Sequence, residues 1–399
     1  MRFAVVSLFA LCSVFGAESD ALSISANIRA VHMPFGTVVD PVYASPDSSD
    51  IAGYTRCGDS ATWTGHYLAA EAYRYKVTAD PDALDGVRRA TAGLKSLVDV
   101  TGTDLLARCI VPMDSQYAAW ITSEEAHNGV YISGQNFWIG HTSRDQYSGT
   151  FFGLAVAYDL VDDPDVRGTA QDLITRMLNF LLSNAWTVVM PDGTPSTTFI
   201  FRPDQQLALL QIGQHVNGAQ FSAIYKKLAG TAPWFVVPPL AYESQDQRDS
   251  YYKFNLDYIN LFSLIRLEAN SVRRAMYRDA YGFVRGATKS HENAFFNAID
   301  RALNGPDDQR DAETIALLNS WLQRPPRDPW VDLRGVYASC VADDQACDPI
   351  PVEQRVPTDF LWQRSPFQLV GGGAGTIESA GIDYILPYWM SRYYQVPGI

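Results

Sequence analysis

The sequence has few charged residues, and it lacks both a basic excess and a long apolar run beyond its start. Only 19% of the 399 residues are charged, and the net charge is −13. Nucleic-acid phosphates need a positively charged face, so this balance argues against nucleic acid as a partner. After residue 19 no segment approaches twenty uninterrupted apolar residues, so we expect no membrane insertion of the mature chain. The charge balance does not exclude neutral or weakly charged ligands.

Several short motifs are also missing. No CxxC pair occurs, and no histidine lies at ligand spacing beside a cysteine, which argues against a zinc site. There is no GxSxG nucleophile elbow. The run Gly371–Gly375 matches neither a phosphate loop nor a dinucleotide fingerprint, so we expect a flexible loop there. We expect no cofactor and no metal, with calcium beside Asp344–Asp348 as an open alternative.

Residues 1–19 are typical of a secretory signal. Arg2 precedes the apolar run Phe3–Phe15, and small residues follow at Gly16, Ala17 and Ser19. We therefore predict export, to a secreted or periplasmic location.

Four cysteines remain after that segment is removed. An even number of cysteines in an exported chain favours disulfides. Cys340 and Cys347 are close enough in sequence to form a local bridge, which leaves Cys57 to pair with Cys109.

The rest of the chain is predicted to form pairs of helices. A polar stretch, Gly58–Ser60, leads into one apolar helix, and Ser143–Tyr147 leads into another. Each of these helices ends at an Asp-Pro pair, Asp80-Pro81 or Asp163-Pro164, where the aspartate can cap the next helix and the proline fits its first turn. The first helix of each pair is apolar all round and the second has one apolar stripe, which indicates an inner and an outer helix.

This alternation predicts an all-α fold, an (α/α)6 toroid of inner and outer helices. We expect it to form a single domain over residues 57–399, with a Pro-rich, Cys-containing excursion at 324–357. An irregular lead-in, residues 20–56, precedes it.

The predicted pattern resembles the six-hairpin glycosidase-like superfamily over roughly residues 55–395. The resemblance implies a site where the inner helices begin and a carbohydrate substrate, an oligo- or polysaccharide. Polysaccharide lyases, sugar epimerases and terpenoid cyclases use the same toroid, so the fold alone does not fix the reaction. The sequence does not indicate an oligomeric state.

Asp59 and Asp145 occupy equivalent positions in the two clearest repeats, just before an inner helix. Two carboxylates on opposite sides of a sugar can act as general acid and general base, so we predict a glycoside hydrolase that uses this pair. Capping of the following helix is the structural alternative for each aspartate.

Other polar and aromatic residues are expected near the same helix starts. Tyr147 is the third catalytic candidate, because a lyase or epimerase needs a Tyr or His base and a group that neutralises a carboxylate. Tyr147 with Arg144 and His141, or Tyr252 with Arg248, would supply both roles. A non-catalytic glycan-binding or scaffold protein is the alternative from another class. The predicted substrate-binding residues are Trp63, His66, Trp138, His141, Arg144, Asp204, Tyr252, His291 and Glu292, although a core or capping role is also possible for His66, Asp204, His291 and the tryptophans.

Overall fold

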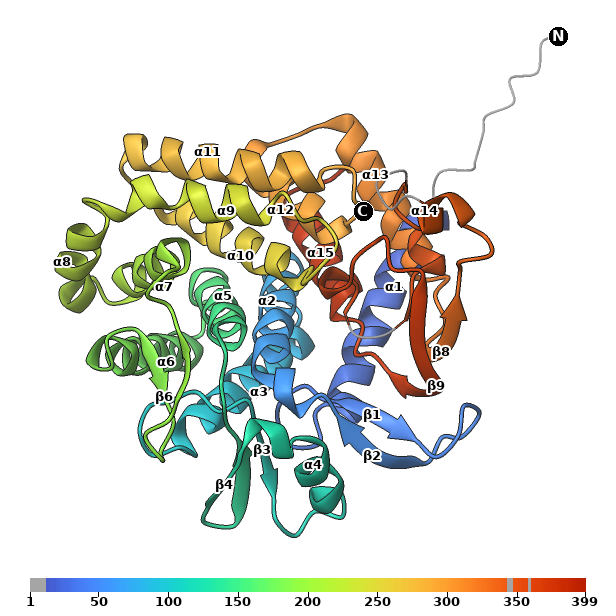
Figure 1. The fold of residues 1–399 in the computed structure, drawn as a ribbon, viewed down its shortest axis with the longest axis horizontal. Coiled ribbons are helices and arrows are strands. Elements are labelled where there is room, and N and C mark those ends of the chain that lie inside the picture. Colours follow the sequence, from blue (N-terminus) through green and yellow to red (C-terminus); the bar gives the residue numbers. More distant parts are fainter. Residues whose placement is uncertain (1–11, 343–346, 358–359) are drawn as a thin grey trace.

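The computed structural model describes residues 12–342, 347–357 and 360–399, with side chains from Glu18 onward. Figure 1 shows helices through the centre and upper part of the molecule, with most strands along its right and lower edges. The helices are α1 (Cys12–Asn27), α2 (Ser60–Thr78), α3 (Pro81–Asp99), α4 (Ala118–Glu124), α5 (Arg144–Leu160), α6 (Pro164–Ser183), α7 (Pro203–Val216), α8 (Gly218–Leu228), α9 (Val237–Glu243), α10 (Tyr252–Leu267), α11 (Ser271–Thr288), α12 (Ala294–Asn304), α13 (Asp308–Trp321), α14 (Ala338–Ala342) and α15 (Ile382–Tyr393).

Nine strands occur within the described ranges and form three antiparallel sheets. The four-stranded sheet has the order β2-β1-β9-β8, the three-stranded sheet β3-β5-β4, and β6 pairs with β7. The prediction of an all-α toroid is therefore wrong, and the fold is mixed. The strands are β1 (Asp40–Tyr43), β2 (Ile51–Thr55), β3 (Cys109–Pro112), β4 (Val130–Ser133), β5 (Asn136–Ile139), β6 (Thr187–Val189), β7 (Pro195–Thr198), β8 (Arg327–Asp332) and β9 (Val370–Glu378).

Two segments predicted to be irregular contribute to the four-stranded sheet. Residues 20–56 contain the second half of α1 and the strands β1 and β2 rather than an unstructured lead-in. The glycine run 371–375, predicted to be a flexible loop, lies inside β9. Glycine is required there because a Cβ on Gly372 would fall 2.1 Å from the carbonyl oxygen of Pro329 in β8.

The helices differ in how much of their surface they bury. In α2, α5, α7, α10 and α15, side chains are buried around most of the circumference. In α3, α6 and α11 one stripe is buried and the opposite face is exposed. The contrast between apolar and amphipathic helices in the sequence therefore corresponds to buried and peripheral helices. One continuous core extends from Ala21 to Met390.

The Asp-Pro pairs begin helices as predicted. The Asp80 carboxylate accepts a hydrogen bond from the backbone N–H of Asp82 at the start of α3. Asp163 accepts from the N–H groups of Asp165 and Val166 at the start of α6. In both helices proline occupies the first turn, where no backbone donor is needed.

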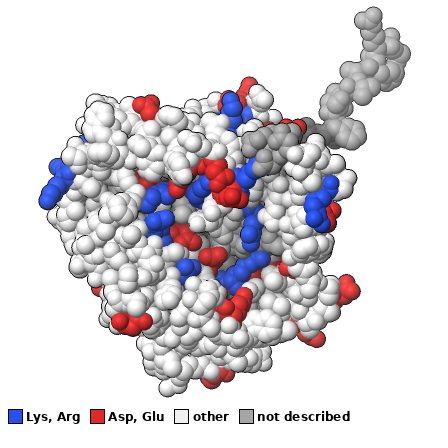
Figure 2. Space-filling view, viewed as in Figure 1, with Lys and Arg blue, Asp and Glu red and all other residues white. Residues whose placement is uncertain are grey.

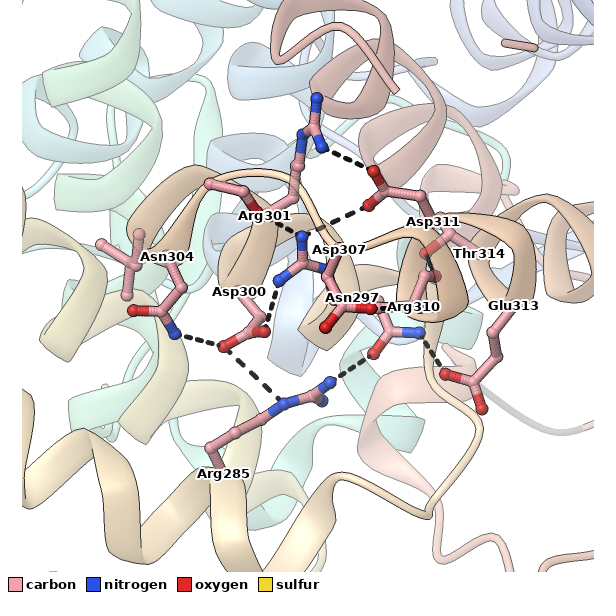
Figure 3. Close-up of polar contacts among 12 residues, drawn as sticks. Arg285, Asn297, Asp300, Arg301, Asn304, Asp307, Arg310, Asp311, Glu313 and Thr314 are labelled. Carbon is pink, nitrogen blue, oxygen red and sulfur yellow. Dashed lines mark hydrogen bonds and ion pairs between the residues drawn. The ribbon is translucent and has the colours of Figure 1, made fainter. Parts of the chain in front are cut away.

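A network of charged side chains joins α11, α12 and α13 (Figure 3). Arg310 binds Asp300 at 2.6 Å, and Arg301 binds Asp311 at 2.5 Å. Arg301 also donates to the backbone carbonyls of Tyr394 and Gln395, so the network anchors the end of the chain. These arginines are paired within the scaffold, so we assign them a structural role.

Both predicted disulfides are present, Cys57–Cys109 and Cys340–Cys347. No helix in the described ranges has the length and apolarity needed to cross a membrane. Residues 1–11 of the predicted signal, and part of the Asp344–Asp348 segment considered for calcium, lie outside the described residues.

Candidate functional site

The site begins with the close packing of α2 against α5. Glycines occupy the crossing: a Cβ on Gly65 would fall 2.1 Å from the carbonyl oxygen of Gly149, and one on Gly153 would fall 2.1 Å from that of Gly65. Larger side chains would force the two backbones apart. Because the helices touch near their first turns, the polar residues that precede them meet.

Asp59 and Asp145 line one cavity of about 300 Å³. On the face shown in Figure 2, basic and acidic side chains gather around a central hollow, while much of the surrounding surface is uncharged. The lining residues of this cavity are Asp59, Arg108, Ser143, Asp145, Tyr252, Gln363 and Arg364.

Gln146 connects the two carboxylates. Its Nε2 lies 3.1 Å from Asp59 Oδ1 and 3.3 Å from Asp145 Oδ2, so these oxygens are at most 6.4 Å apart, the sum of the two distances. Its Oε1 accepts from the backbone N–H of Thr62 at 3.0 Å, which directs the amide nitrogen toward the acids. The Gln146 side chain is fully buried, and its orientation is therefore fixed from both ends.

Asp59 does not cap α2. It is the residue before the helix, but its side chain makes no capping hydrogen bond, so the capping alternative is wrong for this residue. Arg108 Nη1 lies 3.8 Å from Asp59 Oδ1 instead. Asp145 lies in the first turn of α5, where the positive end of the helix dipole favours a carboxylate.

Arg108 is held by groups from both halves of the site. Its guanidinium donates to the carbonyl oxygens of Gly58 and His141 and to Ser143 Oγ at 2.8 Å. The next residue, Cys109, is bridged to Cys57, two positions before Asp59. The disulfide therefore connects the start of β3 to the segment that carries the first carboxylate.

Tyr147 does not reach the cavity. Its side chain is fully buried and its hydroxyl accepts a hydrogen bond from the backbone N–H of Leu106 at 3.3 Å. Burial raises the pKa of this phenol well above its usual value. The position conflicts with the predicted catalytic role, because the ring points into the core rather than toward the carboxylates.

Three further candidates are packed in the interior. Trp63 stacks on Phe360 with ring centroids 3.5 Å apart, and Trp138 stacks on Tyr131 at 4.5 Å. The buried His66 ring lies 2.8 Å from the carbonyl oxygen of Thr62, and burial lowers its pKa to about 4. None of the three lines the cavity, and their contacts support core roles.

Three more candidates differ in their surroundings, and these are Tyr252, His141 and Arg144. Tyr252 is 46% exposed and lines the cavity. His141 is exposed and contributes its carbonyl oxygen to Arg108. Arg144 donates to the carbonyl oxygen of Thr198 at 3.2 Å, and burial together with the nearby Arg202 charge lowers its pKa.

Asp204 belongs to a buried charge cluster. Arg202 binds Asp204 at 2.8 Å, Asp257 at 3.1 Å and Glu243 at 2.6 Å. Burial raises the pKa of Asp257 well above its usual value and also raises the pKa of Glu243. One guanidinium therefore forms ion pairs with three acids, and the Asp204 carboxylate is bound to Arg202.

His291 and Glu292 lie outside the cavity lining. His291 is 1% exposed, its Nδ1 lies 2.9 Å from the Tyr251 hydroxyl, and burial lowers its pKa to about 4. Glu292 lies 3.5 Å from Arg355. The neighbouring Asn293 caps α12 through Phe295 and Phe296, so capping explains this polar run in part.

The sequence reasoning missed Arg108, Gln146, Gln363 and Arg364. Local sequence features could have indicated two of these residues. Gln146 is the third member of the polar stretch Arg144–Tyr147, and Arg108 precedes a cysteine predicted to form a disulfide near Asp59. Gln363 and Arg364 come from a segment more than two hundred residues after Asp145. Only folding places them beside the carboxylates.

Comparison with protein-family models finds no match, and no curated protein matches the chain either. The resemblance to the six-hairpin glycosidase-like superfamily therefore stays a prediction. Within the described ranges, no group of three or more His, Cys, Asp or Glu residues could hold a metal ion.

Proposed function

We propose that the chain is an exported carbohydrate-active enzyme, a glycoside hydrolase that uses Asp59 and Asp145 as its pair of acids. One observation carries the proposal: both carboxylates line a single cavity with at most 6.4 Å between the oxygens that share Gln146. Carboxyl groups in glycosidases are separated by roughly 5 to 9.5 Å, depending on whether the reaction retains or inverts configuration.

The surroundings of Asp59 favour a role for its ionised form. The Arg108 guanidinium, 3.8 Å from Asp59, stabilises a negative charge on that carboxylate. We therefore assign Asp59 as the base or nucleophile, and Asp145 is the second carboxyl group of the pair. Tyr252, Ser143, Gln363 and Arg364 supply polar groups for sugar hydroxyls from the walls of the same cavity.

A uronate lyase or epimerase is the second candidate, supported by Tyr252. This phenol lines the cavity together with Arg108 and Arg364, so a base and cations for a uronate carboxylate lie around one space. Tyr147, the first base considered for this reaction, is buried and bonded to Leu106. A lyase should therefore depend on Tyr252 rather than on Tyr147.

The test is a panel of oligo- and polysaccharides incubated with wild type, Asp59→Asn, Asp145→Asn and Tyr252→Phe. Hydrolysis predicts new reducing ends, no absorbance from unsaturated uronate, and loss of turnover in both Asn variants. Asp172→Asn is the control, because Asp172 pairs with Arg176 on α6 and does not line the cavity.

Unsaturated-uronate absorbance that disappears in Tyr252→Phe would replace the hydrolase with a lyase. Ligand binding without turnover across the panel would favour a glycan-binding protein. Full activity in both Asn variants would overturn the assignment of the two aspartates.

A further inference from the structure

A second and larger cavity lies between α1, the end of α13 and the start of α15. Its volume is about 470 Å³, and it shares no lining residue with the carboxylate cavity. Residues from distant parts of the chain form its walls, including Asn27, Trp321, Arg324, Arg327, Glu378 and Gly381. A cavity of this size can hold a molecule as large as a mono- or disaccharide.

Arg324 is the unusual group in this cavity. Its side chain is only 7% exposed, yet its buried Nε has no hydrogen-bond partner and its ion pair with Asp383 Oδ2 is 3.6 Å long. Asp383 Oδ2 also accepts from the backbone N–H of Leu361 at 2.9 Å, so this acid is shared. Burial lowers the pKa of Arg324 against the opposing effect of Asp383. A buried guanidinium normally uses several of its five donors, as Arg202 does.

The start of α15 supplies a second feature that suits an anion. This twelve-residue helix begins after Gly381, which has φ 79° and provides no side-chain cap. Ser379, Ala380 and Gly381 all line the cavity. The first N–H groups of a helix and its dipole favour a negatively charged ligand at that end. The buried Arg324 and the start of α15, whose first turn also carries its ion-pair partner Asp383, therefore line the same space.

The remaining walls restrict the ligand further. The Trp321 ring, Ile24 and three prolines give an apolar surface suited to a ring or carbon chain. Glu378 accepts from Asn27 at 2.8 Å and lies 3.6 Å from His32, so its charge is balanced within the protein, while Ser23, Asn27 and Asp20 can bind hydroxyl groups.

We propose that this cavity is a binding site for a small hydroxylated carboxylic acid, such as a sugar acid. The carboxylate would bind Arg324 and the start of α15, and the ring would lie against Trp321. The proposal concerns a site separate from the carboxylate pair and holds whether or not the chain is a hydrolase.

Isothermal titration of the full chain with glucuronate tests it, with glucose and inorganic phosphate as comparison ligands. We expect glucuronate to bind, and glucose to bind at least about tenfold more weakly. Arg324→Gln should weaken glucuronate binding by at least about tenfold, the usual effect of losing one charged hydrogen bond. Arg334→Gln, which changes an exposed arginine that lines neither cavity, should leave the affinity unchanged.

Arg324→Lys is a second variant, needed if Arg324→Gln does not fold, because lysine keeps a positive charge opposite Asp383. It should fold and retain weakened glucuronate binding, since lysine cannot form the two-pronged contact of arginine. Absence of glucuronate binding in the millimolar range would overturn the proposal. So would equal binding of glucose, tighter binding of phosphate, or a loss caused by Arg334→Gln rather than by Arg324→Gln.

Discussion

Gly65 of α2 lies so close to Gly149 of α5 that a Cβ on Gly65 would fall 2.1 Å from the Gly149 carbonyl oxygen. This contact brings together the starts of two helices that are more than eighty residues apart. The relative position of the Asp59 and Asp145 carboxylates depends on this contact.

Gly65→Ala should therefore reduce both stability and activity. The added methyl group must displace backbone, and overpacking of this kind costs roughly 1–3 kcal/mol of unfolding free energy. Urea denaturation measures the loss, and turnover of any substrate found with the panel should fall with it.

Gly168→Ala is the matched control, because Gly168 is exposed on α6 with nothing within 4 Å of the new Cβ. Alanine there should be neutral or stabilising by up to about 1 kcal/mol. Equal effects of the two substitutions would mean that the contact between α2 and α5 is not tight.

Gln146→Met tests the shared amide. The variant keeps a side chain of similar length but removes the donor to both carboxylates, so each carboxylate gains freedom to move. We expect kcat/KM to fall by at least roughly 10- to 100-fold, the size expected for each charged hydrogen bond that is lost.

A purely structural role for Gln146 would lower stability and leave kcat/KM of the folded protein unchanged. Gln171→Met is the comparison, because Gln171 donates to the carbonyl oxygen of Val216 at the surface of α6. It should leave kcat/KM unchanged.

Loss of the Cys57–Cys109 bridge should destabilise the chain more than loss of Cys340–Cys347. The bridges span 52 and 7 positions, and the chain-entropy relation gives about 4 and about 2 kcal/mol of stabilisation. Thermal unfolding of the two double-alanine variants, Cys57→Ala/Cys109→Ala and Cys340→Ala/Cys347→Ala, measures the difference. The opposite order would show that strain or residual structure, rather than loop length, dominates.

Stability should fall as the pH rises from about 6.5 to about 9 because of His32. Burial of this side chain lowers its pKa, but the carboxylates of Asp40, 3.3 Å away, and Glu378, 3.6 Å away, outweigh burial and raise it to about 9. A folded-state pKa above the unfolded value means that stabilisation is complete below the unfolded pKa of about 6.5 and disappears as His32 loses its proton.

The expected loss is at most about 3 kcal/mol of unfolding free energy between those pH values. His32→Gln should be less stable than wild type near pH 6 and should show a flatter dependence up to pH 9. Parallel curves for the two proteins would exclude His32 as the titrating group.

Local signals in the sequence were sufficient for several features. Asp80-Pro81 and Asp163-Pro164 mark helix starts because capping depends only on neighbouring residues. The disulfides followed from cysteine number and spacing, and the pairing of Asp59 with Asp145 followed from a repeat in which each precedes an apolar helix. Such features need no knowledge of the remaining chain.

The tertiary structure decided the rest. The strands are short, and β1 pairs with β9 across more than three hundred residues, so sequence periodicity does not reveal the sheet. The same long-range packing buries Tyr147 against Leu106 and brings Gln363 and Arg364 to the carboxylate cavity. It also encloses Arg324 beside the start of α15. A side chain's environment depends on which distant segments pack around it, and the pattern of its neighbours along the chain does not specify those segments.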